Sequence, residues 1–506
     1  MTINPSTPVL VGVGQVSERL DDPDYRALSA VDLGAAAARA ALADAGLASL
    51  DRLDLVVGVR QFEVSHPKAV APLGRSDNYP RSVTDRLDLE PGHAVYDVVG
   101  GDSPQRLVAE AGARIAAGEI DSALLVGSEA MSTARHFADR DDAPDHVEHR
   151  GGQLEDRGYE IEDMITASQV RYGLVGPPPQ YALLEHARRG RLGLSRESYA
   201  KTMGELFAPL SEVAADNPHS AAPTARSAAE LIEVTPKNRM VADPYPRFLV
   251  ARDQVNQGAA VLLTSVGRAR ELGIDESRWV FLHGHAKARA PRMVERPDMG
   301  ESQTATAALR GALDSAGVGV EDIDCFDIYS CFPVAVFAAC DALDLAPDDP
   351  RGLTLTGGLP YFGGAGNNYS MHAIAEAVDR ARRTPGSRAL VAANGGIISK
   401  YAVGIYSTEP REWQPGVDPQ PQLDAVPLVE SVDEYDGEAA VETFTVMPFA
   451  GTEMGILVCR NDAGQRFFAQ ADPADEQLTE LLATGEPLGR RVAVTTSDGR
   501  NLARLA

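Results

Sequence analysis

The chain has 506 residues, 44% of them hydrophobic and 24% charged, so it is long enough to bury a sizeable core, and disordered or disulfide-stapled classes are excluded. Its formal charge of −26 repels the phosphate backbones of nucleic acids and anionic membrane surfaces, so we expect neither a nucleic-acid partner nor a membrane partner. The four cysteines (Cys325, Cys331, Cys340 and Cys459) have no zinc-ligand spacing. They are interpreted as reduced thiols, and no metal site is predicted. The sequence has no secretory leader pattern and no run of about 18 apolar residues, so we expect a cytoplasmic protein.

The first 130 residues alternate short apolar runs with alanine- and leucine-rich periodic stretches. Helical patterns cover about 31–45 and 104–117, and each is followed by a glycine, a residue typical of helix ends. The apolar runs that predict buried strands lie at 9–14, 55–59, 94–99 and 123–127. Apolar strands separated by helices indicate βαβ units and a sheet that is covered on both faces.

The composition of the chain changes twice in its middle part. Residues 134–256 are crowded with charged residues and prolines, and we interpret them as a polar insertion that carries helices. After a strand at 258–264, the alternation of strands and helices resumes and continues to residue 408. The sequence therefore predicts an N-terminal half at 1–265 and a C-terminal half at 266–408, related by an ancient duplication.

The remaining residues open with a proline-rich segment. Five prolines fall between residues 409 and 427, which predicts a semi-rigid linker over 409–429. Beyond it, short alternating strands are separated by turns at 461–464 and 497–499. This pattern predicts a small antiparallel β-barrel domain at 430–506.

The segment Gly100-Gly-Asp-Ser-Pro-Gln105 lies between a predicted strand and a predicted helix. Ser103 is in position to cap this helix, with Pro104 as the first helical residue. The N-terminus of a buried helix favours an anion or a thiolate beside it, so Ser103 is a candidate ligand-binding residue. A plain strand-to-helix turn is the alternative interpretation. No cysteine lies within 200 residues of the segment, so any nucleophile within it would be Ser103 itself.

Five further segments, taken in order, resemble the motifs of SCP2-type thiolases. Leu124-Leu-Val-Gly-Ser-Glu-Ala-Met-Ser132 resembles the segment after the thiolase nucleophile helix, and Asn256-Gln-Gly-Ala-Ala-Val resembles the family's DGAAA strand. Asp327-Ile-Tyr-Ser-Cys-Phe332 is similar to the HDCF motif, and Val391-Ala-Ala-Asn-Gly-Gly396 falls where CxG is expected. Gly357-Gly-Leu-Pro-Tyr-Phe-Gly-Gly-Ala-Gly366 matches the GHPxG motif in spacing.

With the added C-terminal strands, the chain is similar to the SCP2-thiolase-related group called thiolase-like protein type 1. This resemblance covers residues 8–408 and the barrel that follows. It implies an α/β protein with the layered thiolase fold, built of two βαβ-rich halves and followed by a small, OB-like antiparallel β-barrel.

The resemblance also implies that the catalytic set of the thiolases is absent. The degenerate positions are Gly100 or Gly101 for the acyl-accepting cysteine, Tyr329 for the histidine of HDCF, Gly364 for the histidine of GHP, and Ala393 or Asn394 for the cysteine of CxG. Thiolysis needs a thiolate nucleophile, a base that forms it and a second acid/base group. We therefore expect no ordinary thiolase (acetyl-CoA acetyltransferase) activity.

Other residues are candidates for the site, each with a plainer alternative. Cys331 is either a displaced nucleophile or a structural cysteine, and with Tyr329 it is the remaining catalytic candidate. Gly363 and Gly395 belong to the glycine-rich loops and are candidates for ligand binding. Tyrosines near the loop at 357–366 can donate to a carbonyl or satisfy a buried polar end; they are Tyr361, Tyr369 and Tyr401. His283 and His285 share a strand face but have no further ligand at metal-binding spacing.

Three functions of different classes follow from these observations. The first is a thiolase-like protein that binds CoA, an acyl-CoA or another lipid-derived ligand without thiolase chemistry and without a further cofactor. The second is a retro-aldol lyase for a β-hydroxyacyl-CoA, with Tyr329 as an acid/base group. The third is a scaffold whose barrel docks a partner. A monomer or a dimer is expected, and a monomer is possible because the insertion and the barrel could cover the usual dimer face.

Overall fold

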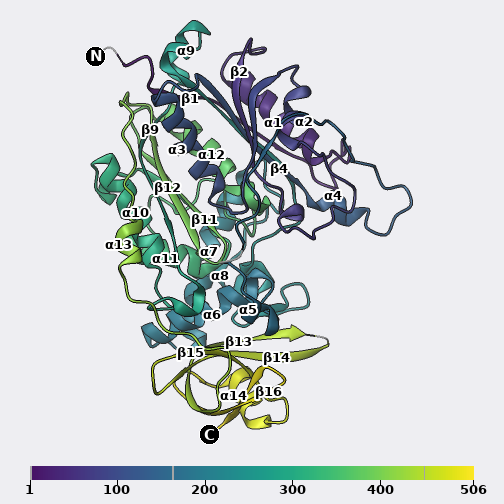
Figure 1. The fold of residues 1–506 in the computed structure, drawn as a ribbon, viewed down its shortest axis with the longest axis vertical. Coiled ribbons are helices and arrows are strands. Elements are labelled where there is room, and N and C mark those ends of the chain that lie inside the picture. Colours follow the sequence, from purple (N-terminus) through teal and green to yellow (C-terminus); the bar gives the residue numbers. More distant parts are fainter. Residues whose placement is uncertain (1–2, 162–163, 450) are drawn as a thin grey trace.

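The computed structural model describes residues 3–161, 164–449 and 451–506. Residues 1–2 and 162–163 of the predicted N-terminal half, and residue 450 of the predicted barrel, lie outside the described residues. Two β-sheets lie at the centre of the body, and a barrel follows at the C-terminal end (Figure 1). Within the described part of the chain, no helix is both long enough and apolar enough to cross a membrane.

The first sheet has six strands in the order β1-β8-β4-β2-β3-β5. Their bounds are β1 (Pro8–Ser17), β8 (Asn256–Ser265), β4 (Ser122–Ala130), β2 (Leu53–Gly58), β3 (Pro91–Tyr96) and β5 (Glu155–Asp156). Strand β8 is antiparallel to both of its neighbours, whereas β4, β2, β3 and β5 are parallel. Every residue of β4 and β8 is buried, as their continuous apolar sequences predict.

The second sheet has four strands in the order β10-β11-β12-β9. Their bounds are β10 (Cys325–Ile328), β11 (Ala389–Gly395), β12 (Lys400–Ser407) and β9 (Phe281–Arg289). Only β10 and β11 are parallel within this sheet. Leu10 of β1 and Val280, just before β9, exchange two backbone hydrogen bonds of 2.9 and 3.0 Å, which join the edges of the two sheets.

Helices and sheets form five layers, which is the layered α/β fold predicted from the sequence. Helices α3 (Ser103–Ala116) and α12 (Tyr369–Arg383) lie between the two sheets, and their apolar side chains share one core with both (Figure 1). Helices α1 (Ala30–Asp44) and α2 (Tyr79–Asp85) cover the outer face of the first sheet. Helices α10 (Gln303–Ala316) and α11 (Pro333–Leu343) cover the outer face of the second.

Glycines in β1 set the distance between the first sheet and α1. A Cβ atom added at Gly12 or Gly14 would overlap the carbonyl oxygens of Ala41 or Ala37 in the helix. The Gly-x-Gly of this strand therefore allows close helix-on-strand packing.

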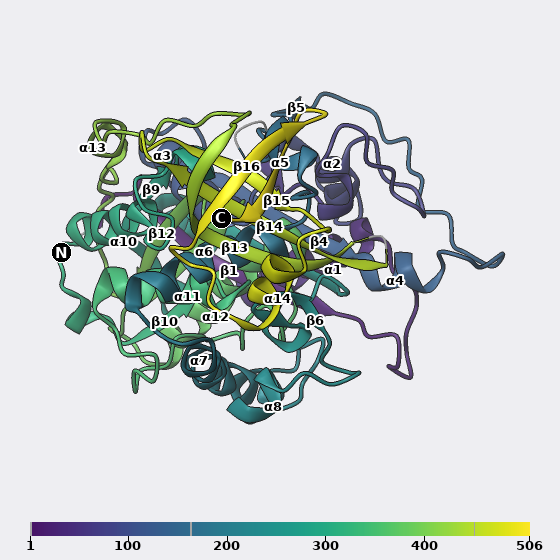
Figure 2. The ribbon, with the colours of Figure 1, turned by 90° about the horizontal axis from the view of Figure 1, so that it is seen from below.

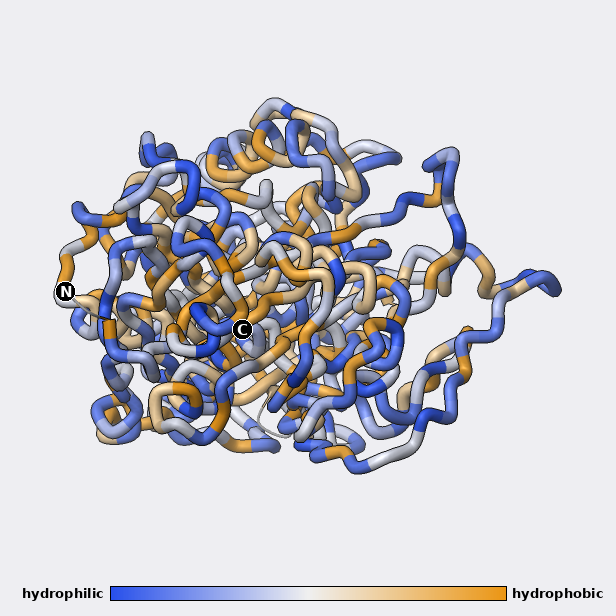
Figure 3. Tube along the Cα trace, turned by 90° about the horizontal axis from the view of Figure 1, so that it is seen from above, coloured by the Kyte–Doolittle hydropathy of each residue, from blue (hydrophilic) through white to orange (hydrophobic). Residues whose placement is uncertain are grey.

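The segment between β4 and β8, where the sequence predicts a polar insertion, carries helices. Apart from β5 and a 3₁₀ helix, its elements are α4 (Met131–His136), α5 (Ala167–Arg171), α6 (Pro177–Leu192), α7 (Arg196–Asp216), α8 (Ala228–Ile232) and the strand pair β6 (Met240–Ala242) and β7 (Tyr245–Pro246). Helices α6 and α7 add buried side chains to the core around α10 and α11. The long loop after α4 projects from the body and is mostly hydrophilic (Figures 2 and 3).

Short helices complete the two halves. They are α9 (Val266–Glu271) and the 3₁₀ helices η1 (Phe62–Val64), η2 (Arg247–Leu249), η3 (Glu276–Arg278), η4 (Met293–Glu295), η5 (Val320–Asp322) and η6 (Gly366–Asn368).

The C-terminal strands close into a five-stranded barrel, which confirms the predicted barrel (Figure 2). The strands are β13 (Gly437–Phe449), β14 (Thr452–Asn461), β15 (Arg466–Ala471), β16 (Arg491–Ser497) and β17 (Arg500–Leu505), in the order β13-β14-β15-β17-β16. One pair differs from the antiparallel prediction, because β15 and β17 are parallel. Helix α14 (Glu476–Thr484) lies in the crossover that such a pair requires.

The proline-rich segment predicted as a linker lies against the second sheet. Trp413 stacks on His285 of β9 with ring centroids 5.0 Å apart. Val417 forms a bridge with Ala286, and a short helix, α13 (Gln420–Asp424), follows. The segment thus follows the body of the protein towards the barrel.

Candidate functional site

The start of α3, the end of β11 and the segment after β10 meet between the two sheets. Gly101 has Tyr329 and the backbone of Asn394 as its nearest neighbours. At the same turn, the amide of Gly100 donates to Asn367 Oδ1 over 3.1 Å. Three of the segments singled out in the sequence (100–105, 327–332 and 391–396) therefore share one site.

The hydroxyl of Tyr329 takes the space that a side chain at position 101 would need. A Cβ atom added at Gly101 would lie 2.5 Å from Tyr329 Oη and 2.5 Å from the carbonyl oxygen of Asn394. Tyr329 is 8% exposed, and its ring meets that of Tyr369 edge to face at 5.3 Å. Burial raises the pKa of Tyr329 well above its ordinary value, so the hydroxyl is a hydrogen-bond donor at neutral pH and not a ready base.

Asp102 is a site residue that the sequence analysis missed. A Cβ atom added at Gly100 or at Gly395 would overlap Asp102 Oδ1, so both glycines make room for this carboxylate. Burial raises the pKa of Asp102, and the neighbouring Arg106 and Lys400 oppose that rise. The clue in the sequence was a lone acidic residue beside two glycines at the start of a helix.

Ser103 does not cap α3 as predicted. The helix begins at Ser103, so Asp102 occupies the N-cap position, and it makes no side-chain capping bond. Ser103 is fully buried, and its hydroxyl donates to the carbonyl of Val98 over 3.3 Å. The prediction was wrong by one residue, because Ser and Asp are both common caps and stand next to each other here.

Cys331 lies in the site with its thiol buried. The amide nitrogen of Asn394 is 3.7 Å from Cys331 Sγ, and burial raises the pKa of this thiol to about 12. Near neutral pH the sulfur therefore stays protonated, which disfavours the role of a displaced nucleophile.

Tyr181 of the insertion helix α6 completes this side of the site. Its hydroxyl donates to the carbonyl of Gly396 over 2.7 Å and accepts from Asn394 Nδ2 over 2.9 Å. Of the two alternatives for the CxG cysteine position, Asn394 is the one that contacts these groups. Ala393 is paired with Ala402 inside the sheet. The sequence analysis could not place Tyr181, since 213 residues separate it from Asn394.

The glycine-rich loop packs against the end of the insertion and the start of β8. The amide of Gly364 donates to the carbonyl of Arg252 over 2.7 Å. Gly363 has a φ of +123°, and a Cβ atom there would lie 2.7 Å from Val255 and 2.8 Å from Gln257 Oε1. Only glycine fits this conformation and this close approach.

The other candidate side chains, three tyrosines and two histidines, differ in whether they have a hydrogen-bond partner. The hydroxyl of Tyr369 is 2.5 Å from Thr356 Oγ1, whereas those of Tyr361 and Tyr401 are buried without a hydrogen-bond partner among the described residues. His283 Nε2 is 2.8 Å from the carbonyl oxygen of Glu409, and burial lowers the pKa of His285 to about 4. In the described residues, no three histidine, cysteine or acidic side chains are grouped as metal ligands.

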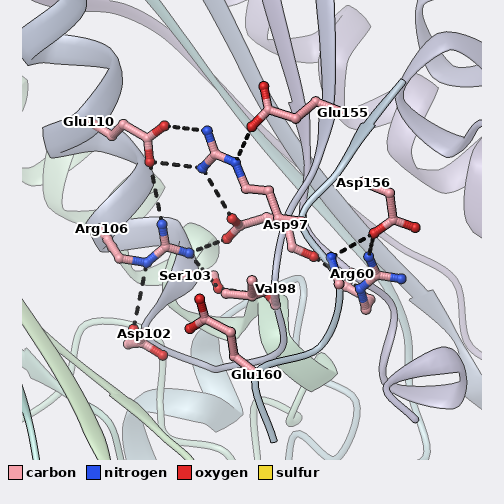
Figure 4. A network of polar contacts seen from close by, with 12 residues as sticks. Arg60, Asp97, Val98, Asp102, Ser103, Arg106, Glu110, Glu155, Asp156 and Glu160 are labelled. Atoms are coloured by element: carbon pink, nitrogen blue, oxygen red, sulfur yellow. Dashed lines mark hydrogen bonds and ion pairs between the residues drawn. The ribbon is translucent and has the colours of Figure 1, made fainter. Parts of the chain in front are cut away.

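Charged side chains surround the start of α3 (Figure 4). Asp97, after β3, is fully buried and pairs with Arg106 of α3 and, at 3.4 Å, with Arg157. Arg157 also pairs with Glu110 at 2.6 Å. These contacts attach the segment after β5 to the helix that carries the site.

We call residues 155–161 the strap. Within it, the carbonyl of Tyr159 accepts from the amide of Val99 over 3.1 Å. Glu160 pairs with Lys400 at 3.4 Å, and Lys400 Nζ donates to the carbonyl of Val99 over 3.0 Å. The strap therefore lies against the chain that leads into Gly100.

Two stacked sheets, a helix pair between them and a site at the start of one of those helices define a thiolase-fold protein. Solved thiolases have the same fold at low identity. The acetyl-CoA acetyltransferase of Syntrophomonas wolfei is 17% identical, with a TM-score of 0.51 over 81% of this chain and 100% of its own. The dimeric peroxisomal thiolase of Saccharomyces cerevisiae is 15% identical, with a TM-score of 0.55 over 81% and 99%.

A more similar structure identifies the family. The crystal structure of a monomeric SCP2-thiolase like protein type 1 from Mycobacterium smegmatis is 46% identical, with a TM-score of 0.85 over 100% of both chains. The family model described as "Thiolase-like protein type 1 additional C-terminal domain" matches residues 418–500. No curated protein matches the chain. The chain belongs to the SCP2-thiolase-like protein type 1 family, which confirms the resemblance seen in the sequence.

Proposed function

We propose that the protein binds an acyl-CoA-type, lipid-derived ligand at the start of α3 and does not carry out thiolase chemistry. The observation that carries this proposal is the position of the Tyr329 hydroxyl, which fills the side-chain space at Gly101. A thiolate cannot stand there, and the nearby Cys331 thiol is protonated at neutral pH. The ligand in this proposal is CoA or an acyl-CoA, with no further cofactor.

The proposal also includes a monomer that acts in the cytoplasm. The Mycobacterium smegmatis relative is described as monomeric. In this chain, β5 pairs with Val95 and Tyr96 of β3 and so covers that part of the edge of the first sheet, where an unpaired strand would otherwise invite a second copy.

One observation favours a second candidate, a retro-aldol lyase for a β-hydroxyacyl-CoA. The Tyr329 hydroxyl lies beside Gly101, and the next residue along the chain, Asp102, has a buried carboxylate. A donor for the thioester oxygen and a base for the hydroxyl are the two groups that this cleavage needs. The Ltp2-ChsH2(DUF35) aldolase has the same fold, with 17% identity and a TM-score of 0.58 over 80% of this chain and 99% of its own.

Two measurements test the proposed function. Calorimetric titration with butyryl-CoA should give saturable binding, and thiolysis of acetoacetyl-CoA should stay at background. Cys331→Ser is the control for the assay, because a rate that survives it would come from a nucleophile elsewhere. No binding of any CoA ester, or thiolysis above background, would contradict the proposal.

A further inference from the structure

Two oxygen atoms inside the site have no hydrogen-bond partner among the described residues: Asp102 Oδ1 and Asn394 Oδ1. Both residues are almost completely buried, with exposures of 4% and 1%. They belong to the two segments that meet at Gly101, since Asp102 follows this glycine and the carbonyl of Asn394 contacts it. Buried acceptors without a donor are rare and costly, so a pair of them in one site calls for a function.

The orientation of the Asn394 amide is fixed by its neighbour. Tyr181 donates its only hydroxyl hydrogen to Gly396, so it can only accept from Asn394. The amide nitrogen of Asn394 must therefore face Tyr181, and Oδ1 is left as a free acceptor.

The Asp102 carboxylate is near cations but is not hydrogen-bonded to them. Arg106 Nε is 3.9 Å from Asp102 Oδ2, and Arg106 is already paired with Asp97 and Glu110. Lys400 donates to Val99 and pairs with Glu160. Asp102 Oδ1 lies instead between Gly100 and Gly395, where a Cβ atom on either glycine would overlap it.

The site thus offers two free acceptors and, in the neutral Tyr329 hydroxyl, one donor. One hydroxyl hydrogen satisfies one acceptor, so a ligand that pairs with both Asp102 Oδ1 and the Tyr329 hydroxyl must carry a hydroxyl group to donate and a carbonyl group to accept. A β-hydroxyacyl thioester has both groups a few bonds apart. A β-ketoacyl thioester offers only acceptors, and a simple acyl thioester lacks the second polar group.

We propose that Asp102 binds the hydroxyl group of a β-hydroxyacyl thioester and so selects it over β-ketoacyl and unsubstituted acyl thioesters. This inference rests on the proposed function, because it concerns the ligand of the same site. Asp102 receives the hydroxyl hydrogen at Oδ1, while Tyr329 donates to the thioester oxygen.

The stability of Asp102 variants separates this role from a structural one. A buried carboxylate oxygen without a donor destabilises the native state, so Asp102→Asn should melt at the same temperature as the wild type or higher. A carboxylate that holds α3 in place would give the opposite result, a fall of several degrees.

The experiment measures the affinities of 3-hydroxybutyryl-CoA (both enantiomers), acetoacetyl-CoA and butyryl-CoA by calorimetry on the full chain. We expect one enantiomer of the hydroxy ester to bind the wild type at least tenfold more tightly than the other two esters. Asp102→Ala should remove this preference. Asp102→Asn should keep part of it, because the amide retains an acceptor oxygen. Glu110→Gln, a second carboxylate on α3 that is engaged by arginines, should leave the preference intact.

Each other outcome has a defined meaning. If the three esters bind the wild type equally, the inference is overturned while the proposed function stands. If Asp102→Ala keeps the preference, or Asp102→Asn lowers the melting temperature by several degrees, Asp102 is not the hydroxyl-binding group. If no ester binds at all, the proposed function fails and this inference fails with it.

Discussion

The Tyr329 hydroxyl is the donor closest to the space at Gly101, so a bound thioester carbonyl should lie next to it. Tyr329→Phe removes that donor and almost no volume, so we expect a stability change of about 1 kcal/mol or less. Acyl-CoA affinity should fall about tenfold, and any turnover about 100-fold. The melting temperature tests the expected stability, and calorimetric titration of the same sample tests the expected affinity.

The matched control is Tyr369→Phe. In the wild type, the Tyr369 hydroxyl is hydrogen-bonded to Thr356, and its ring packs against the ring of Tyr329. The Tyr369→Phe substitution should lower stability and leave affinity unchanged. If Tyr329→Phe instead lowers stability and leaves affinity unchanged, Tyr329 has only a structural role.

Glu185 of α6 is a second residue with measurable consequences. It is completely buried and accepts from the hydroxyls of Tyr199 (2.5 Å) and Tyr245 (2.6 Å) and from the amide of Val334 at the start of α11 (2.7 Å). Burial raises the pKa of Glu185 to about 7. The native state thus holds this proton more tightly than the unfolded chain does.

The stabilisation from this proton is complete below the unfolded pKa and is lost as the pH rises towards 7. Glu185→Gln cannot titrate. The stability of the wild type minus that of the variant should therefore fall between pH 5 and pH 8, by at most about 3 kcal/mol. Urea unfolding at several pH values measures this difference, with the exposed Glu205→Gln as control. A difference that does not change with pH would refute the assignment.

The residues that sequence patterns located were those within recognisable segments. Tyr329, Cys331 and Asn394 do share one site, but Asp102 and Tyr181 were missed. Asp102 was overlooked because its neighbour Ser103 already explained the start of the helix. Tyr181 was overlooked because the contacts of an inserted helix depend on tertiary packing, which no local pattern encodes.

At the scale of secondary structure, the two-residue strand β5 affects whether the first sheet can pair with a second molecule. It pairs with β3 at Val95 and Tyr96, and Arg157, directly after it, donates its amide to the carbonyl of Tyr96 over 3.0 Å. The two β3 residues that β5 covers cannot pair with a second molecule. The strap thus protects part of the edge of the first sheet and also packs against the chain that leads into Gly100.

Arg157→Pro removes both that amide donor and the ion pairs with Asp97 and Glu110. We expect the strap to detach, β3 to become an open edge and the protein to self-associate. Light scattering coupled to size-exclusion chromatography measures the mass. The control is Arg150→Ala, in the loop before β5, which removes the exposed ion pairs of Arg150 with Asp85 and Glu90. Its mass in solution should equal that of the wild type. A monomer in both variants would show that β5 does not control association.

Long apolar strands and alanine-rich helices were predicted correctly because burial on both faces leaves an unbroken apolar pattern. Strand β5, with only two exposed residues, has no such pattern. The insertion was predicted only as a region with helices. Its helix α6 carries buried charged side chains such as Glu185, Arg188 and Arg189, so its sequence does not show a clean apolar face.

At the scale of the whole molecule, hydrogen bonds from arginines hold the barrel on the body. Arg466 of β15 is fully buried, pairs with Glu442 and donates to carbonyls of 294–297 in the C-terminal half. Arg196 of α7 donates to Leu482 and Gly485 of the barrel. The barrel was predicted from alternation, but this docking could not be, because it joins residues far apart in the sequence.

We expect limited proteolysis to cut first within 415–421, at the predicted boundary before the barrel domain. Because the barrel is docked, the two fragments should co-elute from a sizing column. Arg466→Ala should release a fragment of about 75 to 90 residues, a size that forms a small domain on its own. Cuts that begin in the insertion would show that the predicted boundary is wrong. Wild-type fragments that separate on the column would show that the barrel is not docked.

The packing of Tyr329 on Gly101 also constrains how this sequence can change. One base change turns a glycine codon into a cysteine codon, yet a Cβ atom at 101 meets both Tyr329 Oη and the carbonyl oxygen of Asn394. Overpacking of this kind typically costs about 1–3 kcal/mol, a large part of a domain's stability. A lineage that acquired the thiol first would be selected against before it gained a nucleophile. The tyrosine and the end of β11 would have to change beforehand, with no catalytic benefit at that stage, so the route back to a cysteine at this position is closed to single mutations.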